Sequence, residues 1–196
     1  MKSTLTNMIL SLGIITIVSA AILAGVQRLT AAPIADAERQ ARVEAVRSVC
    51  PDFDNDPIEA RIEVVPDGET TPVAVYPATL GGKPAGAAVE SYSPDGFSGE
   101  IKIMYGFDKD GNVTGYQVIS HAETPGLGAK MGDWFHSPEG HRSVIGLNPA
   151  TTNMTVSKDG GDIDAITAAT ITSRAFLDAL RRASSAYLKS VKDRSL

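Results

Sequence analysis

The sequence predicts an α+β protein in which a single N-terminal transmembrane helix precedes one α+β domain with an antiparallel sheet. Three observations support this fold class. No charged residue occurs between positions 3 and 27, short segments in the middle of the chain alternate between apolar and polar residues, and the C-terminal segment repeats apolar residues at helical spacing. The resulting order of helix, strands, loops and helix is typical of the α+β class.

The apolar N-terminal segment is long enough to cross a membrane. Its core, residues 8–26, is close to the ~20 residues that span a hydrocarbon layer of ~30 Å as a helix. A cleavable signal peptide is the alternative, because the small residues 30–32 resemble a cleavage site, but its hydrophobic region is typically only ~7–15 residues long. We therefore expect residues 1–30 to be an uncleaved anchor. Basic residues flank both ends, so the charge pattern does not predict the orientation.

A helical stalk is predicted between the anchor and the domain. Pro33 suits the first turn of a helix, where a missing N–H costs nothing. Ala45 and Val49 then fall on one helical face. We assign residues 31–55 to the stalk and residues 56–196 to the domain, whose size is typical of one hydrophobic core.

Five segments are predicted to form strands, and a hairpin joins the last two. The strands are expected at residues 61–65, 73–76, 87–92, 101–107 and 113–121. Residues 110–112, Asp-Gly-Asn, are a turn signal between the last two strands. Residues 125–148 are rich in Gly, Pro and His and are expected to be loops. A final amphipathic helix is predicted around residues 176–188.

Composition limits the possible functions. A formal net charge of -5 and a sequence pI near 5.2 argue against nucleic-acid binding, which requires clustered Lys and Arg. The single cysteine, Cys50, excludes an internal disulfide, and we interpret it as a partly buried small residue.

A run of hydroxyl-bearing and small residues precedes the final helix. Residues 164–173 read DAITAATITS. The start of a helix offers free backbone N–H groups and the positive end of the helix dipole, and small side chains allow another group to approach, so a phosphate is the expected ligand. The alternative, which composition alone favours, is a plain N-cap in which Thr172 or Ser173 begins the helix.

This run resembles the flavinylation motif of the FMN-binding domain family, Asp-x-x-(Ser/Thr)-(Gly/Ala)-Ala-(Thr/Ser). The fixed positions are filled by Asp164, Thr167, Ala168, Ala169 and Thr170, and Gly is the more common residue at position 168. The resemblance implies that FMN is covalently bound to Thr170 by a phosphoester, which a separate flavin transferase forms with FAD as the donor. Thr167 is the nearest alternative attachment site. Thr172 is counted with these residues as cofactor-binding.

A second signature occupies residues 121–128, HAETPGLG. Its Pro-Gly pair is typical of a type II turn, and Gly128 allows close backbone approach; the alternative is a simple hairpin exit loop. The string resembles a signature of the G subunits of Rnf complexes and the C subunits of sodium-pumping NADH:quinone reductases. This resemblance implies that four residues of the string line the flavin, namely Glu123, Thr124, Gly126 and Leu127.

Two further residues are predicted to contact the cofactor. The segment around Phe97 resembles a loop of the same families, so Phe97 is expected either to cover the flavin ring or to be a core aromatic at a turn. Lys158 is expected either to neutralise the FMN phosphate or to be a solvated side chain. His136 and His141 could suggest a metal site, but zinc motifs on helices need ligands one turn apart, and Pro138 and Gly140 disfavour a regular helix there. We therefore expect a surface loop and no metal site.

The two resemblances together imply an electron-transfer subunit of an Rnf-type ion-translocating oxidoreductase, linked to ferredoxin and NAD, with no catalytic residues and no substrate turnover of its own. The implied partners are the other membrane and iron–sulfur subunits, and the implied location is the bacterial inner membrane with the flavin domain on the periplasmic side. A quinone reductase C subunit or a stand-alone FMN carrier is the redox alternative. A membrane-anchored binding module or hydrolase is the alternative from another class, although no Gly-x-Ser-x-Gly motif occurs.

Overall fold

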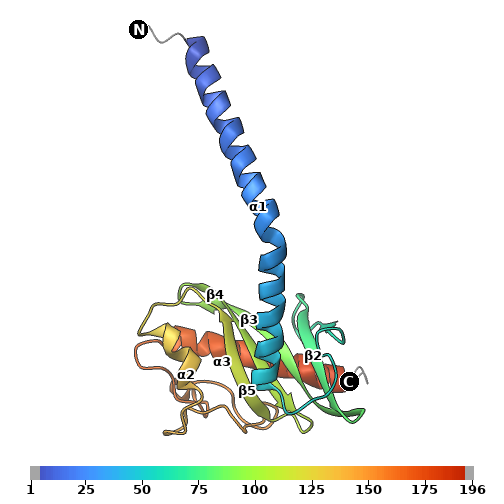
Figure 1. Cartoon of the computed structure of the whole chain (residues 1–196). Helices are drawn as coiled ribbons and strands as arrows, with labels where there is room; N and C mark the ends of the chain where they lie inside the picture. Colours follow the sequence, from blue (N-terminus) through green and yellow to red (C-terminus); the bar gives the residue numbers. More distant parts are fainter. Residues whose placement is uncertain (1–4, 193–196) are drawn as a thin grey trace. The chain divides into compact units, whose positions relative to one another are not determined.

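The computed structural model describes residues 5–192 and confirms the predicted fold class (Figure 1). The chain divides into two compact units, Met1–Arg42 and Val43–Leu196. The second unit contains a five-stranded antiparallel sheet in which every strand pairs with its neighbour in sequence. Its strands are β1 (Ile62–Val64), β2 (Val73–Leu80), β3 (Lys83–Gly96), β4 (Gly99–Asp108) and β5 (Val113–Ser120).

The first helix, α1 (Leu5–Val49), is continuous and contains Pro33 in its interior. The expectation that Pro33 begins a separate stalk helix is therefore wrong. A proline inside a helix removes one backbone hydrogen bond, and the alanines that precede it in the chain, Ala31 and Ala32, have the highest helix propensity and support a continuous helix.

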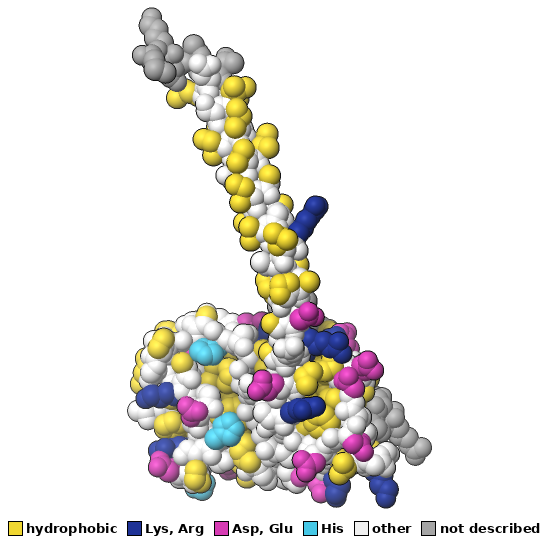
Figure 2. All heavy atoms as spheres, viewed as in Figure 1, with side chains coloured by type: hydrophobic (Ala, Val, Ile, Leu, Met, Phe, Trp, Pro, Cys, Tyr) yellow, Lys and Arg dark blue, Asp and Glu magenta, His cyan; other side chains and the backbone are white. Residues whose placement is uncertain are grey.

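In the first unit, the apolar side chains of α1 are exposed. Every Met, Leu, Ile and Val side chain between residues 8 and 26 is at least 50% exposed, and Figure 2 shows the hydrophobic surface that they form along this part of the helix. Within residues 5–192, one helix is long and apolar enough to cross a membrane by length and composition. These properties fit a membrane-anchored protein, while the boundaries of the anchor and stalk stay predictions.

The five predicted strands are confirmed, and β2, β3 and β4 are longer than expected. Most of the residues added at their ends are small or polar, so the alternation of apolar residues stops before the pairing does. In the hairpin between β3 and β4, for example, pairing continues to Gly96 and Gly99, which leaves Phe97 and Ser98 as the turn.

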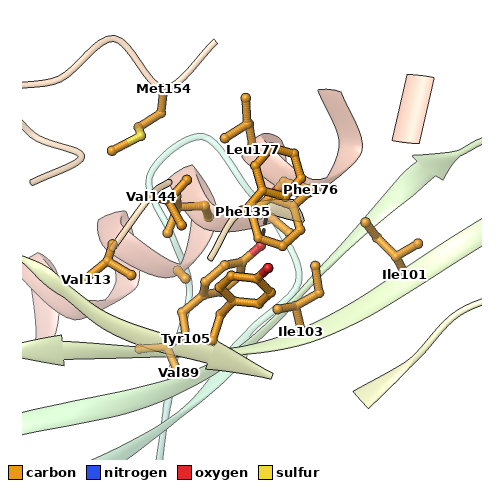
Figure 3. Close-up of a cluster of buried hydrophobic side chains, with 14 of the residues drawn as sticks. Val89, Ile101, Ile103, Tyr105, Val113, Phe135, Val144, Met154, Phe176 and Leu177 are labelled. Atoms are coloured by element: carbon orange, nitrogen blue, oxygen red, sulfur yellow. Dashed lines mark hydrogen bonds between the residues drawn. The ribbon is translucent and has the colours of Figure 1, made fainter. Parts of the chain in front are cut away.

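The long helix α3 (Thr170–Lys192) packs against one face of the sheet and forms the main core. Figure 3 shows Tyr105 of β4 pointing at Phe176 of α3, and the Tyr105 hydroxyl donates to the Phe176 carbonyl oxygen at 2.8 Å. Phe135 stacks on Phe176 with ring centroids 4.1 Å apart. The predicted helix is therefore confirmed, and its buried aromatic face fixes its position on the sheet.

The last turns of α1, which belong to the second unit, pack on the opposite face of the sheet. Their buried residues form a smaller core with Tyr76, Ala88 and Met104 among others. The cross-strand glycines Gly106 and Gly115 create the space for this contact, because a Cβ at Gly106 would overlap the Val49 carbonyl group and one at Gly115 would lie 3.1 Å from the Val49 Cα.

Cys50, at the end of these turns, is half-buried as predicted. Burial raises the pKa of its thiol to about 12. The side chain is therefore protonated at neutral pH and poorly reactive.

The segment predicted to be loops contains two short helices. They are η1 (Gly128–Lys130) and α2 (Met131–Trp134), and a second single-turn helix, η2 (Ser157–Asp159), precedes the motif. Helices of one turn are too short to show an apolar periodicity in the sequence. Met131 of α2 and Phe135, which follows it, are buried in the core. The remainder of residues 125–148 is irregular, as expected.

Candidate functional site

Three segments that are distant in sequence meet around one open cavity in the second unit. They are the β3–β4 turn, the loop after β5 and the start of α3, and the cavity between them has a volume of about 260 Å³. The lining is mainly apolar and consists of Phe97, Glu123, Thr124, Leu127, Gly128, Ala168, Ala169, Thr170, Ile171 and Thr172. All of these residues except Gly128 and Ile171 are predicted from the sequence to bind the cofactor.

Thr170 is the first residue of α3, and its side chain is half-buried at the cavity. The first residues of an α-helix carry N–H groups with no acceptor inside the helix, and they lie at the positive end of the helix dipole. The Thr170 hydroxyl is thus placed beside a local excess of positive potential. Such a position suits an oxygen that carries a phosphate.

Lys158 adds a formal positive charge at the same place. Its ammonium group donates to Thr170 Oγ1 at 3.4 Å from the single-turn helix η2, twelve residues earlier in the chain. The side chain is therefore next to Thr170 and not elsewhere on the surface, although Lys158 itself is exposed.

The alternative in which Thr172 or Ser173 simply caps the helix is wrong. The Ala169 carbonyl accepts from the Ser173 N–H at 3.1 Å, so α3 has already begun before either hydroxyl residue. Ser173 is fully buried; its hydroxyl accepts from the Ile166 N–H at 2.9 Å and donates to the Ala169 carbonyl at 3.0 Å. These bonds hold the end of the motif against the first turn of the helix.

Ala168 has a left-handed backbone conformation, with φ of 63°, and no other described non-glycine residue has a positive φ. Residues with a Cβ pay roughly 1–2 kcal/mol for this conformation. A glycine would adopt this φ without that cost, and Ala168 lies two residues before the start of α3.

The predicted type II turn after β5 is confirmed. The Leu127 N–H donates to the Thr124 carbonyl at 3.2 Å, and Gly126 has a φ of 77°. The turn exposes Leu127, which is 42% exposed, beside the cavity. Phe97 is 66% exposed on another wall, so it is not the core aromatic considered as its alternative.

Glu123 is almost completely buried, with 4% of its surface exposed. One carboxylate oxygen accepts from the Ser98 N–H at 3.0 Å, and the other accepts from the Thr172 hydroxyl at 2.6 Å. The Glu123 side chain is therefore hydrogen-bonded to both the β3–β4 turn and the start of α3.

Asp164 does not line this cavity. Its carboxylate accepts from the His141 N–H at 3.0 Å and from the Ser157 hydroxyl at 3.2 Å, while its carbonyl accepts from Trp134 Nε1 at 2.9 Å. The His141 N–H holds the pKa of Asp164 below its ordinary value. Of the other predicted site residues, Thr167 is exposed and neither it nor Gly126 lines the cavity.

Two lining residues are not predicted from the sequence to bind the cofactor. Ile171 is 47% exposed. In the sequence, it could have been noticed as an isoleucine that lies outside the apolar stripe of the final helix. Gly128 is expected only to allow close approach, and a Cβ there would indeed overlap Glu123 and lie 2.6 Å from Thr172 Oγ1. Among residues 5–192, no group of three or more His, Cys, Asp or Glu could hold a metal ion.

Comparison with known proteins defines the class first. Residues 96–185 match the family described as FMN-binding domain, and this range contains the entire cavity. The chain therefore contains an FMN-binding domain.

Relatives then define the particular family, the G subunits of ion-translocating oxidoreductase complexes. The chain is 34% identical over 191 residues to the G subunit of Pseudomonas aeruginosa (strain UCBPP-PA14), covering 93% of this chain and 87% of that protein. It is 37% identical over 191 residues to the G subunit of Aliivibrio fischeri (strain MJ11), covering 93% and 90%. It is 42% identical over 138 residues to the G subunit of Yersinia pestis, covering 67% and 64%. The chain belongs to this family of Rnf-type G subunits.

The residues of the cavity fit FMN. Apolar side chains of Phe97, Leu127 and Ile171 provide walls for a flat ring system, and the start of α3 with Lys158 provides a site for a phosphate. Thr170 supplies a hydroxyl between these two environments.

Proposed function

We propose that this chain is the flavin-bearing electron-transfer subunit of an Rnf-type complex and carries FMN bound to Thr170 by a phosphoester. The observation that carries the proposal is the position of Thr170: a half-buried hydroxyl at the first residue of α3, on the cavity wall and 3.4 Å from the Lys158 ammonium group. Membership of the G-subunit family supports the redox role.

Bound FMN would supply the capacity to accept and release electrons one at a time. The chain's own residues have the tasks of binding and orientation. Lys158 and the first N–H groups of α3 would offset the negative charge of the phosphate, while Leu127, Phe97 and Ile171 would flank the ring. A covalent link at Thr170 prevents loss of the cofactor and fixes its distance from neighbouring redox groups.

The wider assignment follows from the same proposal. The subunit would exchange electrons with neighbouring membrane and iron–sulfur subunits in a complex that links ferredoxin and NAD to ion movement. A flavin transferase would install the FMN with FAD as donor. The flavin domain would lie on the periplasmic side of the inner membrane, with α1 as the single membrane anchor.

Flavin fluorescence after denaturation tests the attachment. The full chain is co-expressed with a flavin transferase and separated on a denaturing gel beside Thr170→Val and the matched control Thr167→Val. We expect fluorescence in the wild type and in Thr167→Val, and none in Thr170→Val. Mass spectrometry of the labelled peptide then locates the phosphoester.

A dark wild-type band would contradict the covalent FMN, provided that the transferase labels a control protein. Fluorescence that survives in Thr170→Val and disappears in Thr167→Val would move the attachment site to Thr167.

A further inference from the structure

We infer that Glu123 is a positioning residue: its buried carboxylate holds the β3–β4 turn and the first turn of α3 together, and thereby orients Thr170 for flavin attachment. This inference rests on the proposed function, because it assigns a residue that prepares the same site. The assignment differs from the expectation that the Glu123 side chain contacts the flavin, since both of its oxygens already have partners within the protein.

The two bonds of Glu123 join three segments of the cavity wall. The Ser98 N–H belongs to the β3–β4 turn, and the Thr172 hydroxyl belongs to α3, 49 residues from Glu123. The 2.6 Å distance to Thr172 is typical of a strong hydrogen bond from a hydroxyl to a charged carboxylate. Within residues 5–192, no ion pair to Glu123 is found, so these donors replace a cation as its partners.

Two glycines form the space around the carboxylate. A Cβ at Gly96 would lie 2.8 Å from one Glu123 oxygen, and a Cβ at Gly128 would overlap the other oxygen and also approach Thr172. Gly128 has no positive φ, so the requirement for glycine there comes from this contact and not from backbone conformation. The chain is thus shaped on two sides to accept a carboxylate at this position.

The geometry of the helix connects Glu123 to Thr170. Residues two apart on an α-helix point about 200° apart. Both residues line the cavity, but Thr172 is buried with its hydroxyl fixed on Glu123, so Thr170 is held on the more exposed side of the same turn, half-buried beside Lys158. Loss of the bond would let the first turn rotate or unwind, and misplacement of a reacting group by ~1 Å can slow a reaction by about 10²-fold.

The test measures the rate at which flavin becomes attached to the full chain in detergent, with a purified flavin transferase and FAD. The variants are Glu123→Ala, Glu123→Gln, Thr172→Val and Thr172→Ser. Ser93→Ala is the matched control, because the buried Ser93 hydroxyl also bonds a carboxylate of α3, Asp178 at 2.9 Å, away from the cavity. Thermal unfolding of each variant is recorded in parallel.

We expect Glu123→Ala and Thr172→Val to slow attachment by about tenfold or more. Glu123→Gln and Thr172→Ser should stay within about threefold of the wild type, since the amide can accept from one partner and bond the other through its NH₂ group, and serine keeps the hydroxyl. Ser93→Ala should attach flavin at the wild-type rate even where its unfolding temperature falls.

Two results would overturn the positioning role alone while the wild type is still labelled. One is attachment at the wild-type rate in Glu123→Ala and Thr172→Val. The other is a loss of rate in Ser93→Ala that matches theirs at an equal fall in unfolding temperature, because this would make the effect one of general stability. An unlabelled wild type overturns the proposed function, and the positioning role with it.

Discussion

The two ends of the segment that resembles the flavinylation motif, Asp164 and Thr170, differ in what their side chains contact. The Asp164 carboxylate bonds the loop at His141 and the hydroxyl of Ser157, and Asp164 does not line the cavity. Thr170 lies on the cavity wall beside Lys158. A short motif can therefore contain one end that holds the chain in place and another that is available for chemistry, and mutations at the two ends should have different consequences.

The largest expected effect on stability comes from breaking the structural end. Asp164→Ala removes two hydrogen bonds at a partly exposed site, and we expect it to lower the free energy of unfolding by about 1 kcal/mol. Thr170→Ala should change it by less than about 0.5 kcal/mol, because that hydroxyl makes no strong bond within the protein. Urea denaturation of the full chain in detergent measures both. Equal losses in the two variants would contradict the division between the ends.

Acid should weaken the same end selectively. The pKa of Asp164 is lowered in the folded state by the His141 N–H, so its contribution to stability is fully present above the ordinary pKa of an aspartate and is lost as pH falls through the folded value. Thermal unfolding between pH 6 and about pH 3 should show a smaller loss of stability in Asp164→Asn than in the wild type. If the unfolding temperatures of the wild type and Asp164→Asn fell equally with decreasing pH, the acid sensitivity would belong to other carboxylates.

A smaller effect on stability is expected at Ala168, which lies in the turn between the two ends. Ala168→Gly relieves the left-handed backbone at φ of 63°, and we expect a gain of roughly 0.5 kcal/mol in the free energy of unfolding, after the greater chain entropy of glycine is subtracted. Ala169→Gly is the control, since its φ is not positive and it should lose stability. A lower free energy of unfolding in Ala168→Gly would show that the left-handed backbone of Ala168 does not destabilise the protein.

The smallest effect is expected at Thr167, which lies between the two ends. Its side chain is exposed and does not line the cavity, so Thr167→Val should change the free energy of unfolding by less than about 0.5 kcal/mol. Flavin attachment should also be unchanged, as measured by fluorescence on a denaturing gel. A reduced signal would indicate that the transferase itself contacts Thr167.

The elements with clear periodicity could be predicted from the sequence. The strands, the type II turn and the final helix are predictable because alternation, a Pro-Gly pair and a helical apolar stripe are local patterns. The same reasoning places Pro33 at the start of a helix, whereas the helix continues through it. The preference of proline for the first turn is statistical and does not exclude a proline inside a helix.

Most of the cavity lining could be predicted from the sequence, but the roles within it could not. The order of residues contains no indication that Asp164 does not line the cavity or that both Glu123 oxygens have internal partners. Both facts depend on which segments the fold brings together over 23 to 49 residues of chain. Local patterns contain no information on such contacts, and only the packed structure supplies them.

The contact of Val49 with Gly106 and Gly115 has a consequence for how this protein can vary in sequence. The helix end meets the sheet through its backbone as well as through its buried side chains, so both partners are restricted in sequence. A Cβ at Gly106 would overlap the Val49 carbonyl group, and one at Gly115 would force a small shift of the helix end. The requirement for glycine therefore lies on two adjacent strands, far along the chain from the helix end that packs on them.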